Sequence, residues 1–389
     1  MNYHIMAQDK FIDSYIEDIY SVEENDNNVF LIRGEPNETN YINTNKEVVY
    51  LGYDHRKITH ELNKINQNDT IIVHWYDYKI AEILAHYTNT LIVYLRGGEF
   101  YEYPFWEHAK RNYDKKTYAR VKKELYPKIN FDNGLKKFIK TLKKRVRQKN
   151  HTKKEYQRRL IQMGRIDYII CGELNVVEIS LLRRLYPSLK AKHIAGFYNL
   201  NFNLTSTLTK KKTDNDRFKI LIGNSATPSN NHLEAFEKVK HIKNVNVYCF
   251  LSYGQEWYKK EIIKSGLKLF GENFIPITEY MDRARFVEFI ANMDVVYMYH
   301  NRSQAWGNIA TALALGKPVF LKRNNPIKEY INAIGIATYN ANDILAFNLN
   351  TLINEEQLKM YNNRDKLEHV ISDELRLNHL KKLLSTYAS

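Results

Sequence analysis

Residues Ile220–Phe236, ILIGNSATPSNNHLEAF, join an apolar strand-like run to an amphipathic helical pattern through a polar loop. The run leads into Gly223, Asn224 and Ser225, and Ser229 and Asn230 come just before the expected helix. Open α/β sheets bind ligands at the carboxyl ends of strands, where short polar side chains and helix N-termini meet. The stretch therefore predicts an α/β fold with a binding loop here. The simpler alternative is that Ser229 or Asn230 only caps the helix.

Apolar runs alternate with helical patterns along most of the chain, which is typical of parallel α/β sheets. We expect strands at residues 4–6, 29–32, 48–51, 70–74, 91–95, 168–171 and 193–196, and again at 218–222, 245–250, 274–276, 295–299 and 318–321. A chain of 389 residues is also too long for one ordinary core. We therefore predict an N-terminal domain over 1–207 with a basic helical insertion at about 105–162, a linker over 208–217, a C-terminal domain over 218–353, and C-terminal helices over 354–389 that pack back on the N-terminal domain.

The positive charge of the chain is concentrated in one segment. The formal net charge is +14, yet residues 108–160 hold 20 Lys or Arg against Asp114, Glu124, Asp132 and Glu155, a local charge of +16. Within this segment an apolar stripe runs at helical spacing through Leu135, Phe138, Ile139, Leu142 and Val146. Such a helix suits an anionic membrane surface, a phosphate backbone, or an ordinary solvated position with its stripe on the core. We favour a membrane contact through Lys110–Arg159 and do not expect nucleic acid, because no nucleic-acid reading module accompanies the charge.

Several classes of protein find no support in the sequence. The N-terminus mixes charged and apolar residues, so no signal peptide is expected, and no apolar run is long enough to span a bilayer. Cys171 and Cys249 each sit in an apolar run, which favours buried thiols and a cytoplasmic location. The histidines show no metal-ligand spacing, and the one Asp-x-Asp, Asp214–Asp216, lies in the expected linker. We expect neither a metal nor another cofactor.

A second polar loop follows the strand at 295–299. Arg302 and Gln304 come first, and Gly307-Asn308 opens a helix. An Arg beside a Gly-started helix N-terminus is suited to a diphosphate, because a fixed charge is combined with aligned amide donors; a solvent-facing Arg and a packing Gly are the alternative. The order of elements matches the nucleotide-sugar half of a GT-B glycosyltransferase. Many retaining members of that fold carry two Glu where this chain has Ser303 and Thr311. The sequence therefore favours a mechanism that inverts the anomeric configuration.

The two loops resemble a specific family, glycosyltransferase family 56, whose members transfer N-acetylfucosamine from a TDP-sugar to an undecaprenyl-diphosphate-linked acceptor. The matching positions are Gly223, Asn224, Ser225, Ser229, Asn230 and His232 in the first loop, Arg302, Gln304 and Gly307 in the second, and Arg323, Asn325 and Pro326 in a third. In the first half, His4–Asp9 (HIMAQD) and His74 match, and Gly98-Glu99 replaces the family's Gly-Ala-Asp.

The resemblance implies a metal-independent GT-B enzyme with two Rossmann-like domains, working at the inner face of the cell membrane in bacterial surface polysaccharide synthesis. The donor would be a TDP-, GDP- or UDP-sugar carrying fucose or N-acetylfucosamine, and the acceptor a glycan or an undecaprenyl-diphosphate-linked oligosaccharide. We assign Glu99 as general base, with Asp9 as second choice and His74 as the residue that orients either carboxylate. The alternatives without a catalytic role are that Glu99 is a surface residue of a loop, that Asp9 only caps a helix, and that His74 only packs in the core. Arg302, Arg323 and the amides at Gly307-Asn308 would stabilise the diphosphate, and Tyr253 would cap the nucleotide. The rival hypothesis is a non-catalytic or nucleic-acid-binding protein on a GT-B-like scaffold.

Overall fold

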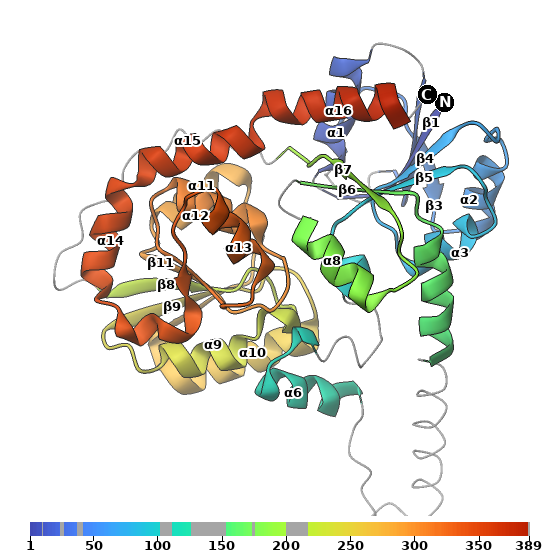
Figure 1. Ribbon diagram of the computed structural model, residues 1–389. Helices are drawn as coiled ribbons and strands as arrows, with labels where there is room; N and C mark the ends of the chain where they lie inside the picture. Colours follow the sequence, from blue (N-terminus) through green and yellow to red (C-terminus); the bar gives the residue numbers. More distant parts are fainter. Residues whose placement is uncertain are drawn as a thin grey trace, which may run out of the picture. The chain divides into compact units, whose positions relative to one another are not determined.

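The chain forms two α/β units, each built on one parallel sheet (Figure 1). This computed structural model describes residues 1–9, 11–23, 27–36, 42–101, 111–125, 153–172, 176–199 and 217–387. The apolar basic stripe at 135–146 and nearly all of the expected linker over 208–217 lie outside the described residues.

Unit 1 contains a seven-stranded sheet in the order β3-β2-β1-β4-β5-β6-β7, with every neighbouring pair parallel. Its strands are β1 (Asn2–Ala7), β2 (Asn28–Arg33), β3 (Val49–Gly52), β4 (Thr70–Val73), β5 (Thr90–Tyr94), β6 (Tyr168–Cys171) and β7 (Lys192–Ala195). Its helices are α1 (Ile12–Val22), α2 (His55–Leu62), α3 (Tyr78–Leu84), α4 (Gly98–Tyr101), α8 (Val176–Leu185) and α16 (Asp373–Tyr387), together with helical residues 153–164. The strand order reverses between β1 and β4, as in doubly wound folds.

Two apolar layers cover the sheet of unit 1. Alternate strand residues point to opposite faces, so Ile5 and Val73 belong to one buried cluster and Met6 and Ile72 to the other. The last helix, α16, packs on α1 and adds apolar side chains to the second cluster (Figure 1). The end of the chain therefore completes the core of its first domain.

Unit 2 repeats this plan with a six-stranded parallel sheet in the order β10-β9-β8-β11-β12-β13. Its strands are β8 (Phe218–Ile222), β9 (Val245–Phe250), β10 (Phe274–Ile277), β11 (Val295–Met298), β12 (Val319–Leu321) and β13 (Tyr339–Asn340). Its helices are α9 (His232–Val239), α10 (Glu256–Phe270), α11 (Arg283–Ala291), α12 (Trp306–Ala314), α13 (Pro326–Ala333), α14 (Leu349–Leu358) and α15 (Met360–Ile371), with short 3-10 turns at Pro228–Asn230, Gly271–Asn273 and Ala341–Ala346. The order reverses between β8 and β11.

One helix of unit 2 comes from the first half of the chain. Helix α6 (Lys115–Leu125) lies between β5 and β6 in sequence but packs against α9 of unit 2 (Figure 1). We call residues 111–125 the arm. The basic insertion expected over about 105–162 is thus divided: the arm belongs to unit 2, whereas residues 153–162 belong to unit 1.

Candidate functional site at the switch point of unit 2

The candidate donor residues gather where the strand order of unit 2 reverses. Strands β8 and β11 are parallel neighbours, so the loops after Ile222 and after Met298 leave the same edge of the sheet side by side. Doubly wound sheets bind ligands at this position because the helices that follow the two strands go to opposite faces and leave a crevice. The two polar loops predicted from the sequence are therefore brought together.

Gly223 makes the turn at the end of β8 possible. Its φ is +68°, a backbone conformation that residues with a side chain rarely adopt. A Cβ placed there would also lie 2.4 Å from Nε2 of His232. His232 is fully buried, and its Nε2 has no hydrogen-bond partner among the described residues. Burial lowers the pKa of His232 to about 3, so the ring is neutral near pH 7. The glycine thus allows backbone to pass directly over an imidazole.

Gln304 joins the two loops. Its side-chain oxygen accepts from Oγ of Ser229 at 2.8 Å, and its amide nitrogen donates to Oδ1 of Asn224 at 3.1 Å and of Asn230 at 2.9 Å. Asn230 is completely buried and also donates to the carbonyl oxygen of Ser225 at 3.0 Å. Ser225, Ser229 and Asn230 therefore shape the loop from inside, while Asn224 is partly exposed.

The helix-cap alternative for this stretch does not describe the structure. The residue before α9 is Asn231, which has a φ of 52° and makes no side-chain cap bond to the helix. Neither Ser229 nor Asn230 occupies the capping position, since both lie in the preceding 3-10 turn.

The loop after β11 carries Arg302, whose side chain is buried. Arg302 is 6% exposed, and its Nη1 donates to the carbonyl oxygen of Ser303 at 3.0 Å. The amide of Asn325 fixes the loop by donating to the carbonyl oxygens of His300 at 3.0 Å and Arg302 at 3.3 Å. His300 is fully buried, and burial followed by the nearby Arg302 charge lowers its pKa to about 3. The guanidinium is the permanent charge nearest the start of α12 in sequence.

Helix α12 begins next to this arginine with its first turn open. Ala305, the residue before the helix, has a φ of 63° and no side-chain acceptor, so it cannot cap the amides of the first turn. A Cβ added to Gly307 would meet no described atom within 4 Å, and both Gly307 and Asn308 are partly exposed. The amides of this turn are thus accessible to an anion.

Two further predicted donor residues lie at the same edge of the sheet. Tyr253 follows β9, is 58% exposed, and accepts a hydrogen bond from Nδ2 of Asn224 at 2.9 Å. The backbone N–H of Ala226 donates to the carbonyl oxygen of Tyr253 at 2.7 Å, which ties the two loops together. Arg323 follows β12 and is exposed.

The two positions at which retaining GT-B enzymes carry Glu are neutral and differ in exposure. Ser303 is partly exposed, whereas Thr311 is fully buried in α12. Nη2 of Arg283, at the start of α11, lies 3.3 Å from Oγ1 of Thr311. A carboxylate is absent at both positions, as the sequence indicates.

The catalytic candidates of the first half lie in unit 1. Asp9 follows β1 and accepts from the backbone N–H of Phe11 at 2.9 Å and from Nη2 of Arg96 at 2.6 Å. Glu99 lies in the short helix α4 after β5, and its side chain falls outside the described residues. Asp9 is therefore both a local helix-start residue and an ion-pair partner.

His74 is buried in an aromatic cluster at the end of β4. Its ring stacks on Tyr94 with centroids 4.6 Å apart, and its Nδ1 lies 2.7 Å from the hydroxyl of Tyr198. Burial, followed by the charges of His4 and Arg96, lowers the pKa of His74 well below its usual value. Nε2 has no hydrogen-bond partner among the described residues, so one polar atom of a neutral ring is left unpaired in the core.

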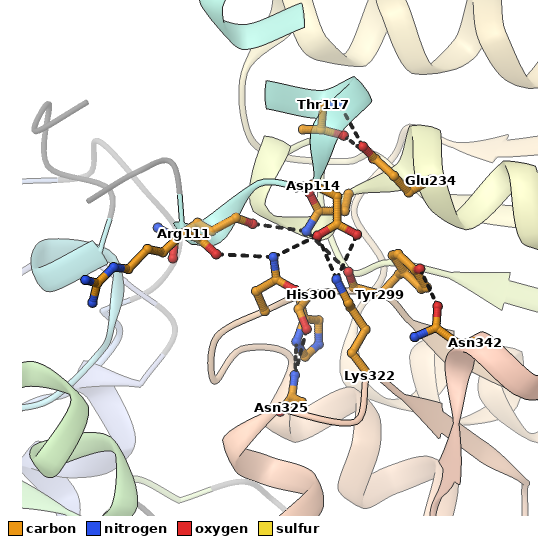
Figure 2. A network of polar contacts seen from close by, with 12 residues as sticks. Arg111, Asp114, Thr117, Glu234, Tyr299, His300, Lys322, Asn325 and Asn342 are labelled. Atoms are coloured by element: carbon orange, nitrogen blue, oxygen red, sulfur yellow. Dashed lines mark hydrogen bonds and ion pairs between the residues drawn. The ribbon is translucent and has the colours of Figure 1, made fainter. Parts of the chain in front are cut away.

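The arm is the part of this site that the sequence did not reveal (Figure 2). Asn231 accepts from the backbone N–H of Asp114 at 2.8 Å and donates to the carbonyl oxygen of Asn112 at 3.0 Å. Glu234 accepts from the backbone N–H of Thr117 at 2.9 Å and from its hydroxyl at 2.6 Å, at the start of α6. The only prior signal was that Asp114 is one of four acids in a strongly basic run.

Two doubly wound units with parallel sheets are the architecture of the GT-B fold, and solved structures agree. The chain is similar to HepE of Anabaena, solved with UDP and glucose (TM-score 0.59, 13% identity, covering 99% of this chain and 100% of that one). It is also similar to sucrose-phosphate synthase of Thermosynechococcus elongatus (TM-score 0.61, 9% identity, 99% and 98% covered). A glycosyltransferase of Rickettsia africae matches with a TM-score of 0.55 at 12% identity, covering 99% of each chain.

The family model of the 4-alpha-L-fucosyltransferases, glycosyl transferase group 56, matches residues 152–369. The chain belongs to this family and is a glycosyltransferase. The matched range contains both loops of the switch point and all the donor candidates. The resemblance and the fold class predicted from the sequence are confirmed.

The described residues contain neither a helix that could span a membrane nor a cluster of metal ligands. None of the helices in the described ranges is both long and apolar enough to cross a bilayer. Across the same ranges, no three His, Cys, Asp or Glu side chains converge in a way that could hold a metal ion.

Proposed function

We propose that this glycosyltransferase moves a deoxy- or acetamido-deoxy-hexose, such as fucose or N-acetylfucosamine, from a nucleoside-diphosphate sugar to a glycan or undecaprenyl-diphosphate-linked acceptor in bacterial surface polysaccharide synthesis. The family description, which names a fucosyltransferase, supports the sugar class. The similarity to HepE, which was solved with UDP-glucose, supports a nucleotide-sugar donor.

The observation that carries the proposal is the position of the buried Arg302 in the loop after β11, just before the uncapped first turn of α12, at the β8–β11 switch point. When the sugar–phosphate bond breaks, negative charge grows on the departing diphosphate. A fixed guanidinium and oriented amide donors stabilise that charge more than they stabilise the ground state, which lowers the barrier. Arg323 is the second cation we assign to this role, and exposed Tyr253 would cover the base or ribose.

The acceptor hydroxyl must lose a proton as it attacks. We assign this role to Glu99, which follows β5 at the carboxyl edge of the unit 1 sheet. Asp9 remains the second choice, because Arg96 and the Phe11 N–H already occupy its carboxylate. A neutral His74 would orient the base or the acceptor rather than supply a proton. The neutral residues Ser303 and Thr311 support inversion.

We further propose that transfer needs no divalent cation and that the enzyme works at the inner face of the cell membrane. Fixed cations and helix amides would replace the metal on the diphosphate. The segment Lys110–Arg159 would hold the protein at anionic lipid, where a lipid-linked acceptor is presented. Addition of EDTA should leave the transfer rate unchanged; a loss of activity that Mg²⁺ or Mn²⁺ restores would contradict metal independence.

The test is a thermal-shift screen against TDP-, UDP- and GDP-sugars, followed by product analysis with the donor that stabilises the protein. We expect one nucleotide class to raise the melting temperature and release of its nucleoside diphosphate on addition of acceptor. Arg302→Met should reduce kcat/KM by about 100-fold or more, as loss of a charged transition-state contact does. If no sugar nucleotide binds, and duplex DNA or RNA binds with steep salt dependence, the rival nucleic-acid hypothesis replaces this one.

Glu99→Gln is the matched test of the base. The substitution keeps the size of the side chain and removes the proton acceptor, so we expect transfer to fall by about 100-fold or more while donor binding stays within twofold. Full turnover by this variant would exclude Glu99, and Asp9→Asn would then be examined in the same assay.

A further inference from the structure

We propose that Lys322 is a ligand of the donor diphosphate and that Asp114, carried by the arm, is the residue that positions it. The inference rests on the proposed donor site and adds to it two residues that the sequence did not single out as donor ligands. Lys322 comes directly after β12, the strand that neighbours β11 in the sheet.

Lys322 belongs to the same loop cluster as Arg302. The backbone N–H of Asn325 donates to the carbonyl oxygen of Lys322 at 3.0 Å, closing a short turn. The side chain of Asn325 in turn donates to the carbonyl oxygens of His300 and Arg302. The turn that carries Lys322 is therefore bonded to the loop that carries the arginine.

The ammonium group of Lys322 is held in one place. It donates to both carboxylate oxygens of Asp114 at 2.7 Å each and lies 4.7 Å from the centroid of the Tyr299 ring (Figure 2). A free lysine side chain samples many rotamers, so fixing it beforehand removes an entropic cost from ligand binding. An ammonium has three N–H groups, so its two bonds to Asp114 leave it able to donate to one ligand oxygen as well. The side chain is 16% exposed, which leaves it accessible.

Asp114 is itself fixed by both loops of the switch point. Its backbone N–H donates to Oδ1 of Asn231, after β8, and its Oδ1 accepts from Nδ2 of Asn301, after β11, at 3.0 Å. Asn231 also donates to the carbonyl oxygens of Ser229 and Tyr299, each at 3.3 Å. The position of the Lys322 charge thus depends on the two donor loops through a single carboxylate.

The experiment compares nucleoside diphosphates with nucleosides. Binding of UDP, TDP and GDP, and of uridine, thymidine and guanosine, is measured by calorimetry on the full chain for wild type, Lys322→Met, Asp114→Asn and the double variant. Lys322→Met should weaken the best-bound diphosphate about tenfold or more and leave its nucleoside within twofold, because only the phosphates meet the ammonium. Asp114→Asn should weaken the diphosphate too. The double variant should be no weaker than Lys322→Met, since Asp114 acts through Lys322.

Glu237→Gln is the matched control. Glu237 pairs with Lys116 of the arm at 2.8 Å, so this variant breaks a different arm contact that involves neither loop. It should bind the diphosphate as wild type does. Lys322→Arg keeps the charge and should retain most of the affinity, which provides a second test if Lys322→Met does not fold.

Three results would overturn the assignment: unchanged diphosphate affinity in Lys322→Met, equal losses for diphosphate and nucleoside, or independent, additive losses in the Asp114 and Lys322 variants. A wild-type protein that binds neither UDP, TDP, GDP nor any sugar nucleotide would instead overturn the proposed function. The two failures are therefore distinguishable.

Discussion

Single residues set the backbone geometry of the donor loops. Gly223 must combine a positive φ with close approach to His232, whereas Gly307 has open space where a side chain would be. The same residue type thus serves two purposes at the switch point: Gly223 is required by the fold, and Gly307 leaves room for a ligand.

Substituting each glycine by alanine separates these purposes. Gly223→Ala should lower the free energy of unfolding by about 2 kcal/mol or more, because its Cβ is strained and overlaps the imidazole. Gly307→Ala should leave stability unchanged or raise it by up to about 1 kcal/mol, yet weaken diphosphate binding by filling the space in front of α12. Denaturant unfolding and calorimetry measure the two effects, and equal destabilisation by both variants would contradict the distinction.

The buried histidines of unit 2 predict how stability depends on pH. The pKa of His232 and of His300 is lowered to about 3 by burial, against about 6.5 in the unfolded chain. Each group favours folding fully above pH 6.5, and this contribution is lost as the pH falls toward 3. At pH 5 the loss is about 2 kcal/mol for each histidine.

His300→Gln should therefore show a smaller decrease in unfolding free energy between pH 7 and pH 5 than wild type. Urea unfolding at the two pH values gives the comparison. Identical pH dependence in the variant would mean that His300 titrates normally in the folded protein.

At the scale of elements, the sequence located the strands but not the long-range contacts. The expected strands agree with β1 to β12 to within two residues, because buried parallel strands are continuous apolar runs bounded by polar loops. Strand β13 was missed, since Tyr339–Asn340 is too short to carry a pattern. The docking of the arm rests on carboxamide and carboxylate contacts between distant residues, for which local periodicity holds no signal.

For the candidate site, the sequence predicted the position of the loops but not the direction of their side chains. Both loops were placed at one edge of one sheet, which follows from parallel topology. The sequence did not predict that Ser225, Ser229 and Asn230 point inward, because a polar residue next to a strand can bind either a ligand or the loop itself. Lys322 was missed for a related reason: its role depends on an acid that lies 208 residues earlier in the chain.

The attachment of α16 to unit 1 predicts an unusual pH effect. Arg376 of α16 donates to Asp18 of α1 at 2.7 Å, with side chains 6% and 13% exposed. Burial nevertheless raises the pKa of Asp18 to about 6, the arginine opposing this shift. The folded-state pKa lies above the unfolded value, so ionisation of Asp18 opposes folding increasingly as the pH rises through about 6.

Arg376→Met removes the opposing charge and should destabilise the protein by about 3 kcal/mol at pH 8 and by less at pH 5, where Asp18 is protonated. The double variant with Asp18→Asn should recover most of the stability at pH 8. Thermal or urea unfolding at both pH values is the measurement, and a loss that does not change with pH would show that packing, not charge, holds α16.

At the scale of the whole molecule, the charge distribution predicts a reversible membrane contact. We expect the protein to sediment with vesicles containing phosphatidylglycerol at low salt and to be released as salt rises, because surface attraction is screened. Replacing the eight basic residues Lys136, Lys137, Lys140, Lys143, Lys144, Arg145, Arg147 and Lys149 by Gln should abolish binding while UDP or TDP affinity is kept. Equal retention by neutral phosphatidylcholine vesicles would argue against a charge-driven contact.

The interleaving of the two units also has a consequence for synthesis. Thr117 of the arm and its partner Glu234 are 117 residues apart, and the first unit lacks part of its apolar cover until α16 has been made. A chain emerging from the ribosome therefore cannot finish its first half and then its second. The first unit is completed only once α16 has been made, so this unit should be readily digested by protease in nascent chains stalled before α16, whereas it should resist in released chains.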